Sequence, residues 1–126
     1  MDVTRDGSQV PCWKEQYCIG TWNVRSMNQG KLEVVKQEMA RVNIDILGIS
    51  ELKWTGMGEF NSDDHYIYYC GQKSLRRNGV GIMINKRVLN AVLGCNLKNG
   101  RMTSVRLQGK AFNIAVIQAY AQNRQC

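Results

Sequence analysis

The stretch QYCIGTWNVRSMNQGKLEVVKQEMARVNIDILGIS, residues 16–50, holds an amphipathic helical pattern between two short runs rich in β-forming residues. The two runs, residues 16–22 and 44–50, predict strands. Residues 31–42 predict a helix, because four apolar side chains recur there at helical spacing: Leu32, Val35, Met39 and Val42. A strand, a helix and a strand in so short a stretch form a βαβ unit, so the two strands should be parallel and adjacent.

Beyond residue 50 the pattern changes to short strands punctuated by glycines. Residues 53–65 are a predicted loop that contains two of these glycines. The strand candidates that follow are residues 66–70, 80–85, 88–93, 102–107 and 112–120. Residues 112–120 are apolar on both alternating faces, which predicts an interior strand covered on both sides. The sequence therefore predicts an α/β fold.

The composition is that of one globular domain, with 126 residues, 44% hydrophobic side chains and a formal net charge of +7. No apolar run approaches the roughly 20 residues of a membrane span, so a membrane partner is not expected. The polar start of the chain is unlike a signal peptide, which predicts an intracellular protein, nuclear or cytoplasmic. One histidine and five cysteines without a CxxC pair argue against a zinc site or a disulfide framework.

The charge is divided unevenly between the two halves of the chain. Residues 1–65 contain all ten acids and seven bases, whereas residues 66–126 contain ten bases and no acid. The second half cannot form ion pairs within itself, so its bases face water, the acidic half or an anionic partner. Nucleic acid is the most specific of these partners, and solvated loop charge is the alternative.

Two polar residues follow the strands of the predicted βαβ unit. Asn23 follows the first strand and Glu51 follows the second. Because ligands of parallel α/β sheets bind at the carboxyl ends of the strands, these side chains should share one edge of the sheet. Mg²⁺ takes one or two carboxylates together with waters and phosphates, and an asparagine amide can hold a metal-bound water or a phosphate oxygen. The alternative is that both residues only cap or turn the chain.

Four motifs occur in order along the chain: IGTWNVRSM (19–27), DILGISELKW (45–54), NGVGIMINK (78–86) and IAVIQAYA (114–121). Together they resemble the first half of the endonuclease/exonuclease/phosphatase superfamily, and more narrowly the apurinic-type endonuclease domain of non-LTR retrotransposons. The resemblance implies a DNase I-like fold, a two-layer β-sandwich flanked by helices. It also implies Mg²⁺-dependent cleavage of DNA phosphodiester bonds by an activated water.

The resemblance assigns roles to individual positions. Asn23 matches the asparagine of the first motif, and Glu51 matches the metal-ligand glutamate of the second. Tyr120 matches the active-site tyrosine whose hydroxyl approaches the scissile phosphate. Arg25 also lies in the first motif and is a weaker candidate for nucleic-acid contact.

Three further bases lie in one predicted loop before residues 80–85, namely Lys73, Arg76 and Arg77. In enzymes of this class such loops hold the DNA backbone, and point charges of this kind give sequence-independent affinity. We therefore expect weak, non-specific DNA binding through these residues. A solvated turn is the alternative reading of the same loop.

The chain also departs from the family pattern. The later Gly-Asp-x-Asn motif and the C-terminal Asp-His pair are missing, and residues 122–126 diverge after Tyr120-Ala121. The SDDH run at residues 62–65 precedes an early strand, so we interpret His65 as a loop histidine and not as that pair. This predicts a loose leader over residues 1–15, a partial domain over residues 16–121 and a divergent tail.

The predicted function is thus a truncated, degenerate endonuclease domain of retrotransposon origin, inactive alone and with weak or absent Mg²⁺ binding. The alternatives are a non-specific nucleic-acid-binding module and a non-functional fragment of a mobile element. A partial sandwich should also leave sheet surface exposed, which favours self-association.

Overall fold

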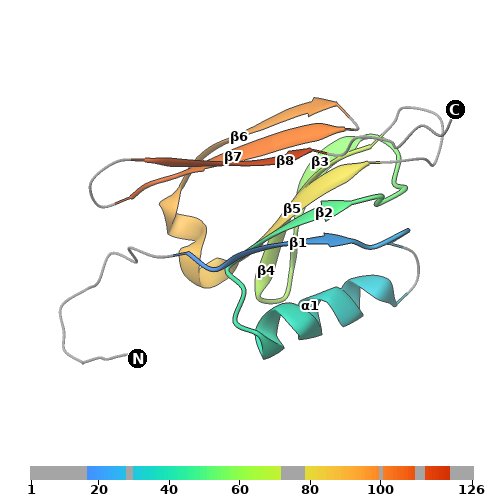
Figure 1. The fold of residues 1–126 in the computed structure, drawn as a ribbon, viewed down its shortest axis with the longest axis horizontal. Coiled ribbons are helices and arrows are strands. Elements are labelled where there is room, and N and C mark those ends of the chain that lie inside the picture. The colour runs from blue at the N-terminus through green and yellow to red at the C-terminus, as the bar shows by residue number, and fades with distance from the viewer. Residues whose placement is uncertain (1–16, 28–29, 72–78, 100, 110–112, 120–126) are drawn as a thin grey trace, which may run out of the picture.

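The computed structural model describes residues 17–27, 30–71, 79–99, 101–109 and 113–119, so the predicted leader and tail lie outside the described residues. Two β-sheets lie one over the other, and one helix covers the outer face of the first sheet (Figure 1). The elements in chain order are β1 (Ile19–Asn23), α1 (Lys31–Arg41), β2 (Ile46–Ser50), β3 (Met57–Ser62), β4 (His65–Cys70), β5 (Val80–Asn85), the 3-10 helix η1 (Lys86–Ala91), β6 (Val92–Asn99), β7 (Met102–Leu107) and β8 (Ile114–Ala119).

The first sheet has the strand order β1-β2-β5-β4-β3. Strands β1 and β2 are parallel neighbours, and Asn23 lies opposite Ser50 at their carboxyl ends. The remaining pairs in this sheet are antiparallel. The βαβ unit predicted from residues 16–50 is therefore present, with its two strands adjacent.

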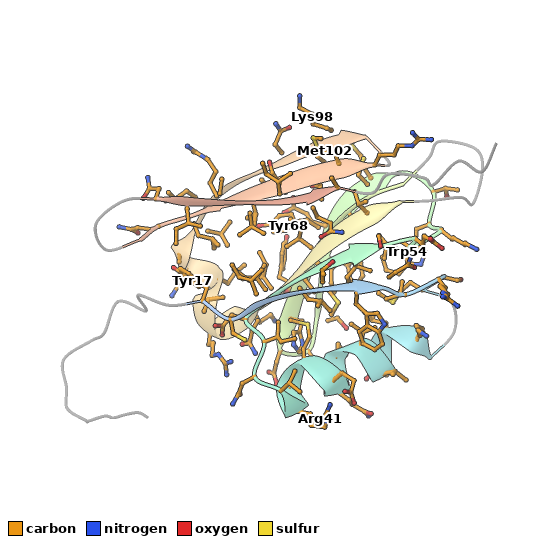
Figure 2. The ribbon with its side chains drawn as sticks, in the orientation of Figure 1. Tyr17, Arg41, Trp54, Tyr68, Lys98 and Met102 are labelled. Carbon is orange, nitrogen blue, oxygen red and sulfur yellow. The ribbon has the colours of Figure 1, made fainter. Side chains whose placement is uncertain are left out.

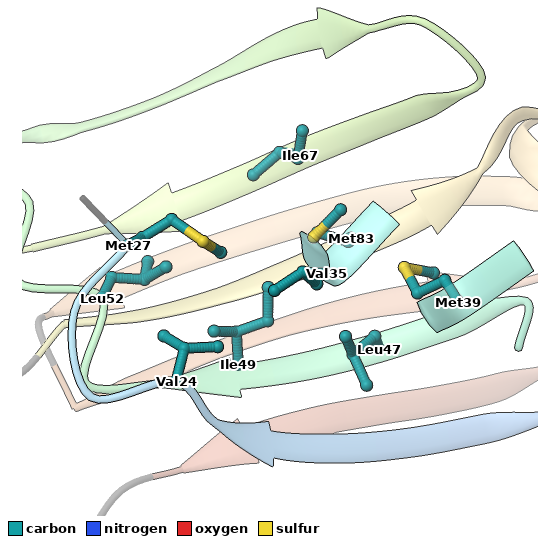
Figure 3. Close-up of a cluster of buried hydrophobic side chains, with 9 residues drawn as sticks. All are labelled: Val24, Met27, Val35, Met39, Leu47, Ile49, Leu52, Ile67 and Met83. Carbon is teal, nitrogen blue, oxygen red and sulfur yellow. The ribbon is translucent and has the colours of Figure 1, made fainter. Parts of the chain in front are cut away.

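Helix α1 packs on the first sheet through one buried face. It begins after Gly30, whose φ of 76° lets the chain turn into the helix, and Val35 and Met39 are its fully buried apolar side chains. These two side chains contribute to a cluster of nine buried residues (Figure 3): Val24, Met27, Val35, Met39, Leu47, Ile49, Leu52, Ile67 and Met83. Val42 was predicted to share this face but is 44% exposed, because the helix ends at Arg41. No described helix is long and apolar enough to cross a membrane.

The second sheet has the order β6-β7-β8 and is antiparallel throughout. Its inner face and that of the first sheet enclose a second buried cluster: Ile46, Tyr68, Ile82, Ile84, Val88, Val105 and Leu107. Gly48 of β2 lies under Gln118 of β8, so close that a Cβ at residue 48 would come within 1.9 Å of the Gln118 side-chain oxygen. The two sheets therefore approach each other closely where the glycine leaves space.

Three predictions about the strands were wrong. Residues 53–65 are not all loop, because Met57–Ser62 forms β3 at the edge of the first sheet. Residues 88–93 are not one strand, because η1 extends to Ala91 and only then does β6 begin. Within residues 112–120 the described strand is β8, Ile114–Ala119; it pairs only with β7 among the described residues and Ile117 is 62% exposed, so the described part of the chain does not cover this strand on both sides as predicted.

Candidate active site

The carboxyl ends of β1 and β2 bring Asn23 and Glu51 together. Asn23 is the last residue of β1, and Glu51 directly follows Ser50, the last residue of β2. The Asn23 Nδ2 donates a hydrogen bond to Glu51 Oε2 over 2.8 Å. The proximity that the sequence predicted is present in the structure, and the chemical roles of the two residues stay predictions.

The amide of Asn23 is fixed at both ends. Its Oδ1 accepts a hydrogen bond from the Arg25 backbone N–H over 3.1 Å, while its Nδ2 faces the Glu51 carboxylate. A carboxylate only accepts hydrogen bonds, so this orientation is the one that satisfies both partners. Asn23 thus holds one oxygen of Glu51 and ties the start of the next loop to the strand end.

We call residues 24–27 and 51–54, which follow β1 and β2, the rim loops. Their backbones continue the pairing of the two strands through hydrogen bonds of 2.8–3.1 Å, which are Val24 N to Ser50 O, Ser26 N to Glu51 O and Met27 N to Leu52 O. Three apolar side chains of these loops are buried in the first core cluster: Val24, Met27 and Leu52. The carboxylate of Glu51 therefore sits on a backbone that is anchored on both sides.

Four residues of the rim loops have positive φ although none is glycine: Arg25 (56°), Ser26 (115°), Glu51 (58°) and Lys53 (62°). This backbone region costs a non-glycine residue about 1–2 kcal/mol. Such residues gather at functional sites, where the surrounding structure over-determines them. Sequence reasoning missed Ser26 and Lys53, because a positive φ is normally signalled by glycine and these positions carry none.

Trp54, the last residue of the second rim loop, and two neighbouring glycines hold that loop in place through the following contacts. The Trp54 indole N–H donates to the Met27 carbonyl over 3.1 Å, and its ring meets Tyr69 edge-on with centroids 5.1 Å apart. The Leu52 N–H donates to the Gly79 carbonyl over 3.2 Å. A Cβ at Gly71 would lie 1.9 Å from the Trp54 carbonyl oxygen. These contacts make Trp54 a structural brace, at the end of the first sheet where Figure 2 labels it.

Among the described residues, the strand ends offer one carboxylate, that of Glu51, to a metal ion. Within the part of the chain that the structure describes, no three His, Cys, Asp or Glu side chains converge on a point that could hold a metal ion. Glu51 is partly exposed and supplies one carboxylate. Mg²⁺ commonly accepts one or two carboxylates and completes its octahedron with waters and substrate phosphates. Structural zinc needs four protein ligands, and the described residues bring no such set together.

The other predicted site residues are placed as follows. Arg25 is exposed on the first rim loop, beside Asn23. Tyr120, Lys73, Arg76 and Arg77 lie outside the described residues, so the predictions made for them are not tested by the geometry.

The lone histidine lies away from the rim loops. His65 pairs with Asn85 at one end of β5, whereas Ser50 pairs with Val80 at the other end. It is the first residue of β4 and only 4% exposed, so its prediction as a loop histidine was wrong. The cause is the tightness of the β3–β4 hairpin, in which Ser62 already pairs with His65.

Two curated proteins are similar to this chain in sequence. No family model matches the chain. Over 121 residues it is 76% identical to craniofacial development protein 2 of Bos taurus and 74% identical to that of Tragulus javanicus. These matches cover 96% of this chain but only 20% and 21% of the relatives, so the chain spans about a fifth of their length.

A solved structure gives the fold. The AP endonuclease LMAP from Leishmania major superimposes with a TM-score of 0.65 at 15% identity, covering 85% of this chain and 40% of that one. The fold is DNase I-like. In this DNase I-like arrangement of two sheets, Asn23 and Glu51 stand at the carboxyl ends of the one parallel strand pair among the described residues.

Proposed function

We propose that this chain carries the metal-binding edge of a magnesium-dependent phosphodiesterase site of the endonuclease class, with DNA as its substrate class. One observation carries the proposal, the 2.8 Å hydrogen bond from Asn23 to Glu51 at the carboxyl ends of β1 and β2. The solved structure with the same fold is an AP endonuclease, which supports the choice of reaction class. The four motifs support descent from a retrotransposon endonuclease domain.

Each predicted site residue has a distinct task under this proposal. Glu51 would hold Mg²⁺, and the bound ion would neutralise charge on a phosphodiester oxygen. Asn23 is a positioning residue, because its amide fixes one carboxylate oxygen of Glu51. Arg25, exposed beside them, would contact the DNA backbone as a point charge. Tyr120 would approach the scissile phosphate through its hydroxyl.

We further propose that the chain by itself is a degenerate endonuclease with negligible activity. Residues 66–126 contain no Asp or Glu, and the lone histidine lies at the opposite end of β5 from the rim loops. A positioned general base contributes about 10²–10⁴ to a rate, so its loss is severe even where metal binding persists. Glu51 alone cannot both bind a metal ion and activate a water.

A direct test separates metal binding from cleavage. Mn²⁺ binding is followed by electron paramagnetic resonance, and nicking is assayed on a duplex that carries one abasic site. We expect weak Mn²⁺ binding that is lost in Glu51→Gln, no nicking, and unchanged Mn²⁺ binding in Glu59→Gln, which removes an exposed carboxylate of β3. Equal Mn²⁺ binding by wild type and Glu51→Gln would overturn the metal site. Metal-dependent nicking that Glu51→Gln abolishes would overturn the inactivity.

A second function, non-specific binding of nucleic acid without cleavage, is favoured by the charge of the second half. Ten bases and no acid in residues 66–126 suit a polyanion independently of any metal. DNA binding that persists in chelator, and that Glu51→Gln does not alter, would favour this function over the metal site.

A further inference from the structure

Strand β3 lies at one edge of the first sheet and lacks the features that usually keep edge strands apart. Its residues, Met57–Ser62, pair with β4 in unbroken register and include no proline, lysine or arginine. By contrast, β6 at an edge of the second sheet has register shifts near both of its ends and carries Lys98. Bulges and lysines discourage pairing between edges, whereas a regular edge strand is a template for another strand.

Hydrogen bonds of the neighbouring strands show which residues of β3 direct their backbone outward. The Asn85 N–H donates to the Asp45 carbonyl over 2.8 Å, so Asn85 faces β2 and not β4. His65 lies opposite Asn85 in β4, so it directs its N–H and C=O to β3, where its partner is Ser62. Because this direction alternates along a strand, the outward N–H and C=O groups of β3 belong to Met57, Glu59 and Asn61.

The edge is open to a neighbouring strand within the described part of the chain. The second sheet stands over the middle of the first, with β6 over β4, β7 over β5 and β8 over β2. The side chains of Met57, Glu59 and Asn61 are exposed on the face of β3 that this arrangement leaves uncovered. On the other face, Phe60 is partly buried and meets Tyr69 with ring centroids 6.0 Å apart. The edge therefore offers outward backbone groups and one aromatic ring.

We propose that two copies of the chain pair through β3, antiparallel and related by a two-fold axis at Phe60. Glu59 then lies opposite the partner's Asn61, and each such pair exchanges two backbone hydrogen bonds. The Asn61 amide can also donate to the partner's Glu59. That carboxylate accepts from Tyr66 through Oε1 over 2.6 Å, and its Oε2 has no partner among the described residues. The two Phe60 rings become a cross-strand aromatic pair, which stabilises the contact further.

Charge and overlap select this register over its neighbours. Paired residues of antiparallel strands share a face, so the axis passes through a residue and not between two. An axis at Glu59 would oppose two carboxylates, and an axis at Asn61 would set Glu59 opposite the partner's Asp63. Opposed like charges destabilise a strand pair. An axis at Gly58 would overlap only residues 57–59 of β3, whereas an axis at Phe60 overlaps residues 58–62.

This edge suits a second copy of the chain better than a polyanion. The only charged side chain of β3 is that of Glu59, which repels phosphate. A second copy brings an amide opposite each carboxylate and needs no further group, because a two-fold contact is self-complementary. The overlap is short, so the pairing should be weak and should depend on concentration.

Analytical ultracentrifugation over a range of concentrations tests the charge pairing. Asn61→Lys sets an ammonium group opposite the partner's Glu59 and should tighten self-association about fivefold, since the axis repeats the change. Asn61→Asp should weaken it by a similar factor, and both effects should fade at high salt. Gln37→Lys and Gln37→Asp, at an exposed position of α1, make the same changes of net charge and should leave self-association unchanged.

Proline tests the backbone contact at the same position. Asn61→Pro removes an outward N–H without breaking a hydrogen bond to β4, so it should abolish self-association while the chain stays folded. Asn61→Ala is the control, because it removes the side chain and keeps the N–H, and it should retain most of the pairing. Circular dichroism verifies the fold of each variant, and the comparison of lysine with aspartate is decisive independently of the proline.

Disulfide crosslinking measures the register directly. In a chain whose cysteines other than the buried Cys70 are replaced by serine, Glu59→Cys and Asn61→Cys are oxidised separately and as a mixture. We expect the crosslinked dimer chiefly in the mixture, because paired Cα atoms about 5.5 Å apart allow a disulfide and more distant diagonal neighbours do not. A crosslink in Glu59→Cys alone or in Asn61→Cys alone would move the axis and overturn this register.

Three further outcomes would overturn the proposal. A chain that stays monomeric at every concentration, with no crosslink in the mixture, would exclude pairing through β3. Self-association that Asn61→Pro leaves intact in a folded chain would assign the contact to another surface. Equal effects of Asn61→Lys and Asn61→Asp would show that Asn61 does not lie opposite the partner's Glu59.

Discussion

The side-chain amide of Asn23 donates a hydrogen bond to the carboxylate of Glu51, joining the ends of two parallel strands over 2.8 Å. The two residues lie 28 positions apart in the chain and meet only because α1 returns the backbone beside β1. The same amide accepts a hydrogen bond from Arg25 N–H. One side chain therefore organises both rim loops.

Replacing Asn23 by aspartate should make the stability of the chain depend on metal. Two carboxylates would then lie in contact and repel, so we expect a lower melting temperature than wild type without divalent ions. Mg²⁺ should restore the loss, because two carboxylates bind it better than one. Asn23→Ala is the control, with a loss of about 1 kcal/mol that Mg²⁺ does not restore. Melting curves with and without Mg²⁺ measure both, and equal responses of the two variants would contradict a metal site here.

Glycine at residue 51 should stabilise the chain relative to alanine. Glu51 has a φ of 58°, where a Cβ costs about 1–2 kcal/mol, so Glu51→Gly should exceed Glu51→Ala by roughly 1 kcal/mol in free energy of unfolding. Urea denaturation measures the difference. At Glu59 in β3, which has no positive φ, the order should reverse because glycine weakens strands. The same order at both positions would argue against strain at Glu51.

His65 should make the fold sensitive to mild acid. Burial, with further contributions from Lys36 and Arg87, lowers the pKa of His65 below 6.5, while Asp64 and Asp63 oppose this shift. The unfolded chain therefore takes up the proton first, and the free energy of unfolding falls as the pH drops from about 6.5 toward the lowered folded-state pKa. The slope should not exceed about 1.4 kcal/mol per pH unit, since one proton is involved.

His65→Leu isolates this effect, because leucine fills the site and cannot titrate. Its unfolding free energy should be flat between pH 6.5 and 5. The hydrogen bond from Lys36 holds the pKa of Asp63 below 3.8. Any stability that Asp63 contributes is therefore lost only at a lower pH than the window of His65. Chemical denaturation at successive pH values makes the comparison. An unchanged slope in the variant would assign the mild-acid sensitivity to other groups.

The bases predicted to hold DNA should act as simple point charges. Changing Lys73, Arg76 and Arg77 together to alanine should weaken binding evenly across DNA sequences and flatten the slope of log K against log salt. Affinities for such contacts are about 10⁻⁴–10⁻⁶ M at physiological salt. Filter binding at several salt concentrations measures the slope. An unchanged slope would identify these residues as ordinary solvated surface.

Two glycines should differ sharply in their tolerance of alanine. At Gly71 the added Cβ would meet the Trp54 backbone carbonyl, which cannot move without shifting the second rim loop. At Gly48 it would meet the flexible end of Gln118, which can turn aside. We expect Gly71→Ala to cost about 2 kcal/mol and Gly48→Ala distinctly less. Thermal melts rank the two variants. The opposite ranking would mean that the contact between Gly48 and Gln118 is more rigid than the contact between Gly71 and Trp54.

The sequence by itself determined the βαβ unit and the pairing of its two candidate residues. Helix α1 and strand β2 carry their own signals, because the period of apolar side chains in α1 and the unbroken apolar run of β2 are local properties of the chain. Once both are assigned, the rule for parallel connections places Asn23 and Glu51 at the same edge.

Only the tertiary structure decided the rest. Strand β3 has a weak local pattern and exists because β4 pairs with it, and β8 is exposed because β7 is its one described neighbour. The backbone of Glu51 is held at positive φ by hydrogen bonds from the other rim loop, which no residue type at that position announces. Periodicity is local and can be seen in one segment, whereas edges, strained backbone and uncovered faces depend on which segments meet.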